Sequence, residues 1–359
     1  MIKEIGVIGA GSWGTTLANL VAEKVDRVHL WVYEKDLCET MARERENVLY
    51  LPGSKLLPHV IPTVSVEEAS RGKDLVVSVV PSQYVRNTLK QMRSYLKEGT
   101  IVLSASKGIE TKTLMLMSQV LHEVLPPQVH TTMSFLSGPS FAREVADKLP
   151  TAVTLASEDA ATAATVQDLL STSYFRVYTS GDVTGVQLGG ALKNVIALAA
   201  GASDGAGLGH NTKAALITRG LAEITRLGIA MGANPLTFQG LSGMGDLVLT
   251  CTGDLSRNRT VGRMLGQGKP LSEILKGMKS VAEGVTTTQS AYHLAKKCGV
   301  EMPITEAVHA ILYDKQEIAP TVEKLFSRKL TEEIYGIPGA ERLTPDPNHR
   351  DKGCDPPSA

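Results

Sequence analysis

The sequence predicts an α/β protein in which an N-terminal doubly wound sheet is followed by an all-helical C-terminal domain. Up to about residue 180, short β-branched runs alternate with longer amphipathic segments, which is the pattern of βαβ units that build a parallel sheet. Beyond that point the strand signal fades and the apolar residues recur with helical periodicity. The length of 359 residues also suits two domains.

The first part, residues 1–180, contains seven strand-like runs. We expect strands at 5–8, 28–33, 75–80, 101–105, 132–136, 152–156 and 175–178. Helices expected between them include 15–23, 84–95 and 160–171. Turn residues at Gly99 and at 137–139 separate these elements.

The second part, residues 181–335, lacks such runs. Its periodicity predicts helices at 184–202, 213–231, 260–267, 286–298 and 304–313. From Gly336 onward the chain is rich in proline, glycine and charge. We therefore expect residues 336–359 to be a disordered tail.

The overall composition argues against some classes of partner. The 37 basic and 37 acidic residues cancel, so no global field recruits nucleic acid or an anionic membrane, and an anionic ligand must be bound locally. The four cysteines, at positions 38, 251, 298 and 354, lack the spacing of a metal site or of a disulfide framework. We expect no metal, and reduced thiols as in the cytoplasm.

Neither a secretory leader nor stable membrane insertion is predicted. The N-terminus has no basic segment followed by a long apolar one. The longest apolar stretch, 195–202, is well short of the roughly 20 residues that cross a bilayer. Lys193, Asn194 and Asp204 bound this stretch.

A glycine motif directly after the first strand predicts a Rossmann-like dinucleotide site. Gly9, Gly11 and Gly14 form GxGxxG between a strand and a helix, and Glu34 follows a second strand 20 residues beyond Gly14. Gly9 permits the tight turn, Gly11 lets the backbone approach a pyrophosphate, and Gly14 lets helix and strand pack closely. The alternative is a glycine-rich turn that binds nothing.

Glu34 bears on the choice of dinucleotide. Its carboxylate is placed to accept hydrogen bonds from ribose hydroxyls and would repel a 2′-phosphate, which favours NAD over NADP. Lys35 could neutralise such a phosphate and weakens this inference. A solvated surface glutamate is the alternative.

A lysine in an apolar helix is the first candidate for catalysis. Lys193 and Asn194 lie in the middle of TGVQLGGALKNVIALAAGA, and burying an ammonium costs free energy unless it is paired or its pKa falls. A lysine with a lowered pKa can exchange a proton near neutral pH. Gly189, one turn earlier, would leave room for a ligand beside the amine. A lysine that reaches solvent from a helix edge is the alternative.

A second polar segment supplies a carboxylate and an anion site. Gly243 and Gly245 bracket an expected turn that presents Asp246, which can pair with a lysine. Ser256 can cap a helix that begins at Arg257, and the free amides of its first turn, together with Arg257 and Asn258, suit a phosphate. The alternative is a capped surface helix with Arg257 and Arg259 in solvent.

Several motifs in order along the chain resemble the NAD(P)-dependent glycerol-3-phosphate dehydrogenases. The resemblance covers residues 1 to about 330, and the motifs together are specific to that family. They are GAGSWGTTLA (9–18), SKGIE (106–110), SGPSFAREV (137–145), LKNVIALAAGASDGAGLGHNTKAALITRGLAE (192–223), GLSGMGDLVLTC (240–251), SRNR (256–259) and VAEG (281–284).

The resemblance implies reversible hydride transfer between a nicotinamide and carbon 2 of dihydroxyacetone phosphate. It implies that Lys193 is the proton donor and acceptor, that Lys107 lies near the reacting oxygen, and that Asp246 orients the catalytic lysine. It places substrate contacts at Lys107, Gly138, Ser140, Lys193, Asn194, Asp246, Thr250, Ser256, Arg257 and Asn258. It places cofactor contacts at Ser12, Trp13, Lys107, Ala142, Arg257, Val281 and Glu283, beside Gly9, Gly11, Gly14 and Glu34.

The same resemblance implies a cytoplasmic homodimer that supplies glycerol 3-phosphate for phospholipid synthesis. Many bacterial members have Arg or His after the second strand, whereas VYEKD (32–36) and ENVLYLPGSKL (46–56) are similar to eukaryotic cytosolic NAD-linked members. NAD is therefore the expected cofactor, with NADP as the alternative. Two other functions stay open: a related two-domain 3-hydroxy acid dehydrogenase, and a non-catalytic dinucleotide sensor that has no need of Lys193, Asp246 and Lys107 together.

Overall fold

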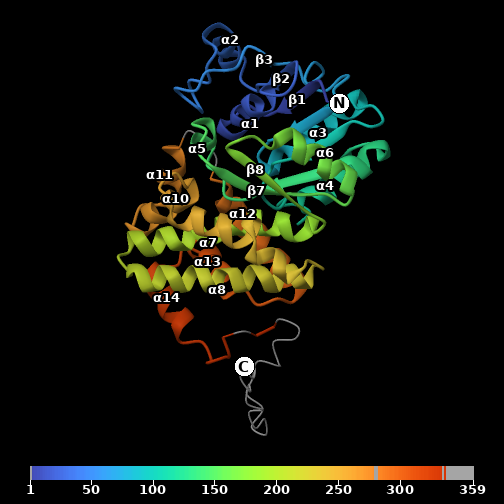
Figure 1. The fold of residues 1–359 in the computed structure, drawn as a ribbon. Helices are drawn as coiled ribbons and strands as arrows, with labels where there is room; N and C mark the ends of the chain where they lie inside the picture. Colours follow the sequence, from blue (N-terminus) through green and yellow to red (C-terminus); the bar gives the residue numbers. More distant parts are fainter. Residues whose placement is uncertain (1, 279–281, 334, 337–359) are drawn as a thin grey trace, which may run out of the picture.

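The computed structural model describes residues 2–278, 282–333, 335 and 336. Its N-terminal half is built on an eight-stranded sheet with the order β3-β2-β1-β4-β5-β6-β7-β8 (Figure 1). The predicted Rossmann-like α/β fold with a helical C-terminal half is confirmed. The strands are β1 (Glu4–Ile8), β2 (Arg27–Trp31), β3 (Val60–Thr63), β4 (Leu75–Ser78), β5 (Ile101–Ser104), β6 (Met133–Ser137), β7 (Thr151–Ala156) and β8 (Phe175–Ser180).

Helices cover both faces of this sheet because its strands are apolar on both sides. In β4, Leu75 and Val77 pack into the core under α1 and α6, while Val76 packs into the core under α3 and α4. All four residues of β4 are buried. The helices of this half are α1 (Ser12–Ala22), α2 (Lys35–Glu44), α3 (Val85–Met92), α4 (Met117–Val124), α5 (Ala142–Ala146) and α6 (Ala160–Leu170).

Two features of the sheet differ from the sequence prediction. The short strand β3 was not predicted, because Val60–Thr63 has only four residues and includes Pro62, which is tolerated at a sheet edge. In addition, β7 runs antiparallel to β6, whereas the other neighbouring pairs are parallel. The sheet is therefore mixed rather than wholly parallel.

The second half packs around one long helix, α7 (Figure 1). By length and composition, its 23 residues are apolar enough to cross a membrane, so the apolar segment is longer than the stretch 195–202 expected from the sequence. However, 83% of its most apolar 18-residue window is buried inside the protein. The helices are α7 (Val183–Gly205), α8 (Gly209–Ala230), α9 (Asp246–Thr252), α10 (Arg257–Gly266), α11 (Leu271–Lys276), α12 (Glu283–Cys298), α13 (Pro303–Tyr313) and α14 (Ile318–Phe326).

Glycines bring α10 unusually close to α7. A Cβ on Gly262 would lie 2.1 Å from the backbone oxygen of Leu198, and one on Gly201 would lie 2.1 Å from that of Arg259. Only glycines allow this approach, since heavier residues would force the two helices apart. The first turn of α10 is thereby held beside the middle of α7, where Lys193 lies.

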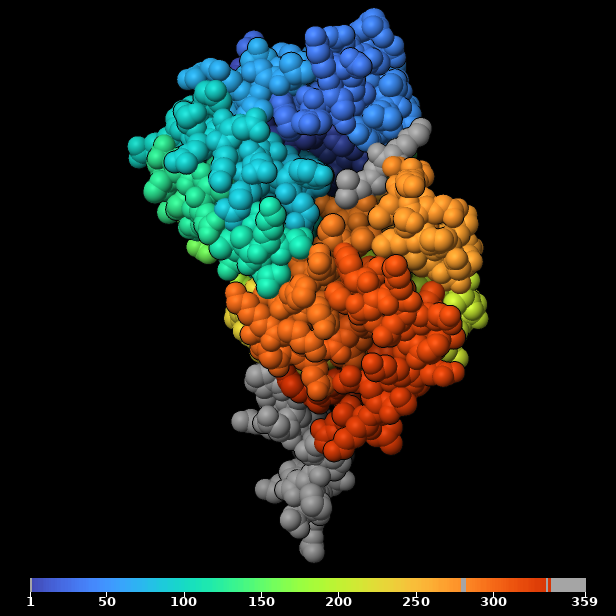
Figure 2. Space-filling model, turned by 180° about the vertical axis from the view of Figure 1, so that it is seen from behind, coloured from blue at the N-terminus to red at the C-terminus, as the bar shows by residue number. Residues whose placement is uncertain are grey.

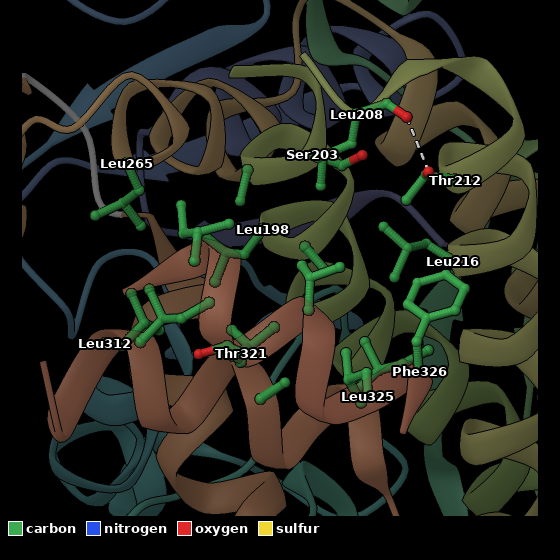
Figure 3. A pocket seen from close by; sticks show the side chains of 18 residues that line it. Leu198, Ser203, Leu208, Thr212, Leu216, Leu265, Leu312, Thr321, Leu325 and Phe326 are labelled. Carbon is green, nitrogen blue, oxygen red and sulfur yellow. Dashed lines mark hydrogen bonds between the residues drawn. The ribbon is translucent and has the colours of Figure 1, made fainter. Parts of the chain in front are cut away.

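An apolar cavity of about 70 Å³ lies within the helical half, between α7, α8, α13 and α14 (Figure 3). Leu198, Leu216, Leu312 and Phe326 are among its lining residues. At its rim the Thr212 hydroxyl donates to the backbone oxygen of Leu208 at 2.9 Å. None of the candidate site residues lines this cavity.

The carboxyl ends of the central strands point toward the helical half. Seen from behind, the blue and cyan residues of the N-terminal half meet the orange residues of the helical half at a narrower part of the molecule (Figure 2). In open α/β sheets, ligands bind at this end, where the strand order reverses. Here the reversal lies between β1 and β4.

Candidate active site

The glycine-rich turn after β1 has the geometry that a bound dinucleotide requires. Gly9 has a φ of 113°, and a Cβ there would lie 2.9 Å from the carbonyl oxygen of Val79. A Cβ on Gly14 would lie 1.8 Å from the carbonyl oxygen of Gly9, so only glycine lets α1 start this close to the strand. The structural roles expected for these two glycines are both observed.

Gly11 differs from these two glycines because it faces open space. Apart from its chain neighbours, no atom of the described residues lies within 4 Å of a Cβ built on it, so no packing contact there requires glycine. Gly11 is exposed and precedes Ser12, the first residue of α1, where unpaired backbone amides attract an anion. These residues fit a dinucleotide whose pyrophosphate approaches the backbone at Gly11.

Glu34 lies where a ribose-binding carboxylate is expected. It is the residue before α2, three positions after the end of β2, and it is exposed. Its carboxylate accepts a hydrogen bond from the hydroxyl of Tyr50 at 2.8 Å. The ammonium of Lys35 lies 3.9 Å from the carboxylate of Glu39, one turn along α2.

Three residues that are distant in sequence form a buried cluster of charge. The carboxylate of Asp246 bonds the Lys193 ammonium through Oδ1 and the Lys107 ammonium through Oδ2, the latter at 2.7 Å. The hydroxyl of Thr250 accepts a further hydrogen bond from Lys193 at 2.8 Å. Asp246 is only 1% exposed, and the side chains of Lys193 and Lys107 are 10% and 17% exposed. The cluster therefore has two ammonium groups and one carboxylate.

This environment changes the acidity of Lys193. Burial, which disfavours the charged amine, lowers the pKa of Lys193 from 10.5 to about 8. The nearby carboxylate of Asp246 opposes the decrease, and the charge of Lys107 adds to it. Lys193 is therefore able to gain or lose a proton close to neutral pH.

The sheet and the helices each contribute one lysine to this cluster. Lys107 follows β5 and Gly138 follows β6, and because these strands are parallel their carboxyl ends meet at one edge. The Lys107 ammonium donates to the carbonyl oxygen of Gly138 at 3.2 Å. Lys193 comes from α7, and Asp246 begins α9.

One expectation about a glycine near the cluster is wrong. Gly189 does not leave room for a ligand, because a Cβ there would lie 2.4 Å from the backbone oxygen of Ser242. Gly189 instead lets the segment Leu241–Gly245 pack against α7. The expected turn that presents Asp246 is this segment, a single π-helical turn that leads directly into Asp246.

The expected anion site at the start of α10 has the predicted cap. The Ser256 hydroxyl accepts a hydrogen bond from the backbone amide of Arg259 at 3.3 Å. Arg257 is exposed, and it forms no ion pair with any residue that the structure describes. Arg259, in contrast, is not solvated as the alternative interpretation assumed, since its guanidinium lies 2.8 Å from Asp204 and 2.7 Å from Asp254.

Asn194 and Asn258 connect this anion site to the lysine cluster. The amide of Asn258 donates to the side-chain oxygen of Asn194 at 2.9 Å and accepts from the backbone amide of Gly284 at 2.9 Å. Both asparagines are buried. They therefore fix α10 and the start of α12 relative to Lys193.

Three of the remaining predicted residues, Ser140, Ala142 and Trp13, lie in the segment after β6 or in α1. Ser140 donates to the carbonyl of Gly138 at 3.0 Å, and the carbonyl of Ala142 accepts from Thr16 on α1 at 3.2 Å. Trp13 is partly buried against the sheet core, with its ring 6.4 Å from that of Phe175, so part of its role is packing. Val281 lies outside the described residues.

Glu283 lies at the entrance of α12, beside the strand-end loops. Its carboxylate accepts from the backbone amide of Ser82 at 3.3 Å. Burial raises the pKa of Glu283, while the charge of Arg257 acts in the opposite direction. Glu283 thus couples the anion site electrostatically to the loop after β4.

Sequence reasoning missed Gly190 and Cys251 near the cluster. A Cβ on Gly190 would lie 2.4 Å from the Ser137 hydroxyl and 3.6 Å from Cδ of Lys107, so this glycine lets α7 approach the sheet. The sequence signal that could have indicated Gly190 is the pair of adjacent glycines, Gly189 and Gly190, in an apolar helix. Burial raises the pKa of the Cys251 thiol to about 12, so it stays protonated beside Lys193.

The arrangement can exchange a proton with a ligand oxygen while keeping positive charge beside it. An amine with a pKa of about 8 supplies or accepts the proton, and a second ammonium remains to stabilise negative charge. The glycine-rich turn before α1 and the capped start of α10 accompany this cluster as candidate sites for a dinucleotide and a phosphate.

Comparisons with known proteins agree with this geometry. Residues 4–163 match the N-terminus of NAD-dependent glycerol-3-phosphate dehydrogenase, and residues 182–323 match its C-terminus. A curated relative from Geobacter sulfurreducens, named glycerol-3-phosphate dehydrogenase for NAD(P)+, is 60% identical over 335 residues, which is 93% of this chain and 100% of the relative.

Two solved structures extend the comparison. The glycerol-3-phosphate dehydrogenase of Coxiella burnetii shares 39% sequence identity with a TM-score of 0.86, over 91% of this chain and 99% of that one. The glycerol-3-phosphate dehydrogenase of Saccharomyces cerevisiae shares 28% with a TM-score of 0.75, over 90% and 99%. Over the whole chain, sequence identity is higher to the Geobacter sulfurreducens and Coxiella burnetii proteins than to the yeast protein.

Proposed function

The chain belongs to the NAD-dependent glycerol-3-phosphate dehydrogenase family, and we propose that Lys193, Lys107 and Asp246 carry out its proton chemistry. The protein is an oxidoreductase that interconverts dihydroxyacetone phosphate and glycerol 3-phosphate with NAD or NADP. When bound, the nicotinamide supplies or accepts the hydride. The observation that carries the proposal is the contact of one buried carboxylate, Asp246, with both lysines.

In ketone reduction, Lys193 donates a proton to the oxygen on carbon 2 as that carbon gains a hydride. The products are the secondary alcohol and a neutral amine, which then recovers a proton from solvent. Lys107, which contacts the same carboxylate, stabilises the oxygen while negative charge develops there. Asp246 holds both ammonium groups and favours the charged form of Lys193.

In alcohol oxidation the same groups act in reverse. Lys193 must be neutral to accept the hydroxyl proton, so this direction gains as pH rises through about 8. Thr250, which accepts from Lys193 and donates to the backbone oxygen of Asp246 at 2.6 Å, holds the amine beside Asp246.

The substrate phosphate binds at the first turn of α10. Ser256, Arg257 and the free amides of that turn supply hydrogen-bond donors and positive charge. Arg257 is available for this role because its guanidinium has no ion-pair partner among the described residues. Asn194 and Asn258, together with Gly138 and Ser140 on the sheet side, line the space between phosphate and reacting carbon.

NAD is the favoured cofactor. The carboxylate of Glu34 suits the ribose hydroxyls and repels a 2′-phosphate. Lys35 lies in an exposed pair, 3.9 Å from Glu39, which does not fix its ammonium in one orientation. NADP therefore stays the alternative. The rest of the dinucleotide would contact six further residues, namely Ser12, Trp13, Lys107, Ala142, Arg257 and Glu283.

In the cell, the protein acts as a cytoplasmic homodimer and supplies glycerol 3-phosphate for phospholipid synthesis. Family resemblance supports these statements. Size-exclusion chromatography with light scattering measures the dimer directly, and a monomer at micromolar concentration would contradict it.

The experiment that tests the function follows nicotinamide absorbance after dihydroxyacetone phosphate is added to the purified protein, with NADH and NADPH in parallel. We expect rapid oxidation of NADH and slower oxidation of NADPH. Equal rates would contradict the cofactor preference alone. If folded protein that binds the dinucleotide oxidises neither, the substrate assignment is wrong, and 3-hydroxy acids are the next substrates to test.

A further inference from the structure

Residues 46–57, the loop that follows α2, form a segment beside the cofactor site, and we call them the brace loop. Glu46 closes the loop, because its carboxylate accepts from the backbone amide of Gly53 at 2.7 Å and pairs with Lys55 at 2.7 Å. An isolated antiparallel bridge joins Glu46 and Lys55 as well. These contacts join the two ends of the loop.

The brace loop is attached to the glycine-rich turn and to α1. The buried amide of Asn47 donates to the carbonyl of Ala10 at 2.8 Å and to the hydroxyl of Thr15 at 2.8 Å. Further along, Asn19 on α1 donates to the carbonyl of Lys55 at 2.9 Å and accepts from the amide of Leu57 at 3.1 Å. The loop thus moves with the turn that receives the pyrophosphate.

Tyr50 joins this anchored loop to Glu34. Its backbone amide donates to Oδ1 of Asn47 at 3.0 Å, and its hydroxyl donates to the Glu34 carboxylate at 2.8 Å. Its ring is half-buried against the sheet core. Burial, with a smaller contribution from Glu34, raises the pKa of Tyr50, so the phenol stays protonated and remains a donor.

Glu34 depends on this contact for its orientation. Its side chain is exposed and has no other hydrogen-bond partner among the described residues. A free glutamate of this kind occupies several rotamers. A carboxylate discriminates between a ribose hydroxyl and a 2′-phosphate only while it points at that position.

We infer that Tyr50 is a positioning residue for cofactor choice, which holds Glu34 in the orientation that accepts NAD and rejects NADP. This inference rests on the NAD preference proposed above. Its distinctive consequence is that Tyr50 acts through Glu34 alone. Loss of the hydroxyl therefore changes the ratio of the two affinities, rather than lowering both equally.

The first test is Tyr50→Phe, which removes only the hydroxyl. Dissociation constants for NADH and NADPH are measured by calorimetry, and kcat/KM is measured with each. We expect the NADH preference to fall about fivefold, the size expected for one hydrogen bond to a charged group that is partly in water. The matched control is Tyr33→Phe, because Tyr33 is adjacent to Glu34, is 80% exposed, and forms no side-chain hydrogen bond among the described residues. It should leave the ratio unchanged.

The second test is a double-mutant cycle with Glu34→Ala. In that background, Tyr50→Phe should change the preference by less than about twofold, since no carboxylate remains to be positioned. If Glu34→Ala lowers the preference but Tyr50→Phe does not, or if Tyr50→Phe weakens both dinucleotides equally, the inference is wrong and the NAD preference stands. If the unmodified protein binds NADH and NADPH equally and Glu34→Ala changes neither affinity, the proposed NAD preference and the role of Tyr50 are both wrong.

Discussion

The cofactor side and the lysine side of the site are built in opposite ways. The part of the cofactor side proposed for the pyrophosphate and ribose is a backbone turn and one exposed carboxylate, both from the segment 9–34. The lysine side consists of buried charged side chains from three distant elements, at 107, 193 and 246. The first binds by shape and open amides, whereas the second depends on burial to change the acidity of an amine.

This difference determines how each side responds to substitution. A glycine turn is sensitive to a single added methyl group, because backbone atoms cannot move aside. A buried charge cluster tolerates small changes of shape but not the loss of a partner, which leaves the other charges unpaired. Substitutions on the lysine side should therefore act on turnover, and those on the cofactor side on dinucleotide affinity.

The largest effect is expected on the lysine side, from Lys193→Ala. Without its proton donor, the reaction should lose about 10³-fold in kcat, in line with the usual contribution of general acid-base catalysis. Steady-state kinetics with dihydroxyacetone phosphate and NADH measures this, with circular dichroism to verify folding. The matched control is Lys90→Ala, an exposed lysine on α3. Turnover within a few-fold of the parent would exclude the role given to Lys193.

The next effect is expected from Arg257→Ala. This variant loses the proposed contact between the Arg257 guanidinium and the substrate phosphate. Because the phosphate is remote from the reacting carbon, KM for dihydroxyacetone phosphate should rise by roughly 10- to 100-fold, and kcat should change less. Arg263→Ala, an exposed arginine in the last turn of the same helix, is the control and should leave KM unchanged. An Arg257→Ala variant with normal KM would place the phosphate elsewhere.

The smallest of these effects separates two glycines of the cofactor side. Gly14→Ala places a Cβ 1.8 Å from a backbone oxygen, so it should lower stability by about 1–3 kcal/mol as well as weaken NADH binding. Gly11→Ala meets no atom of the described residues within 4 Å apart from its chain neighbours, so it should weaken NADH binding at unchanged melting temperature. Calorimetry and thermal unfolding measure the two quantities. Equal melting temperatures for the two variants would contradict the packing role of Gly14.

The sequence allowed more of the cofactor side to be predicted than of the lysine side. The spacing of Gly9, Gly14 and Glu34 is local, so strand, turn and helix could be placed from periodicity and glycine position. Lys193 was noticed because a charge in an apolar helix is anomalous. The contact of Lys107 with Asp246 joins residues 139 positions apart and left no local pattern, so only resemblance indicated a role for Lys107.

What could not be predicted depends on tertiary contacts. Gly189 was interpreted as space for a ligand, but a π-helical turn fills that space. The edge strand β3 is too short to show alternation, and the reversed direction of β7 is set by its pairing with β6. The hydrogen bond from Tyr50 to Glu34 could not be predicted either, since a single tyrosine in a loop belongs to no periodic pattern.

The account depends most on the claim that Lys193 exchanges its proton near neutral pH because burial and Asp246 set its acidity. The most direct test is the pH dependence of kcat/KM for glycerol 3-phosphate oxidation in the parent and in Asp246→Asn. The parent rate should rise with pH and level off above about 8, because the neutral amine is the acceptor. Removing the carboxylate that raises this pKa should move the inflection to lower pH by about one pH unit or more. A rate that does not vary between pH 6 and pH 10, or an inflection that Asp246→Asn leaves in place, would contradict the claim.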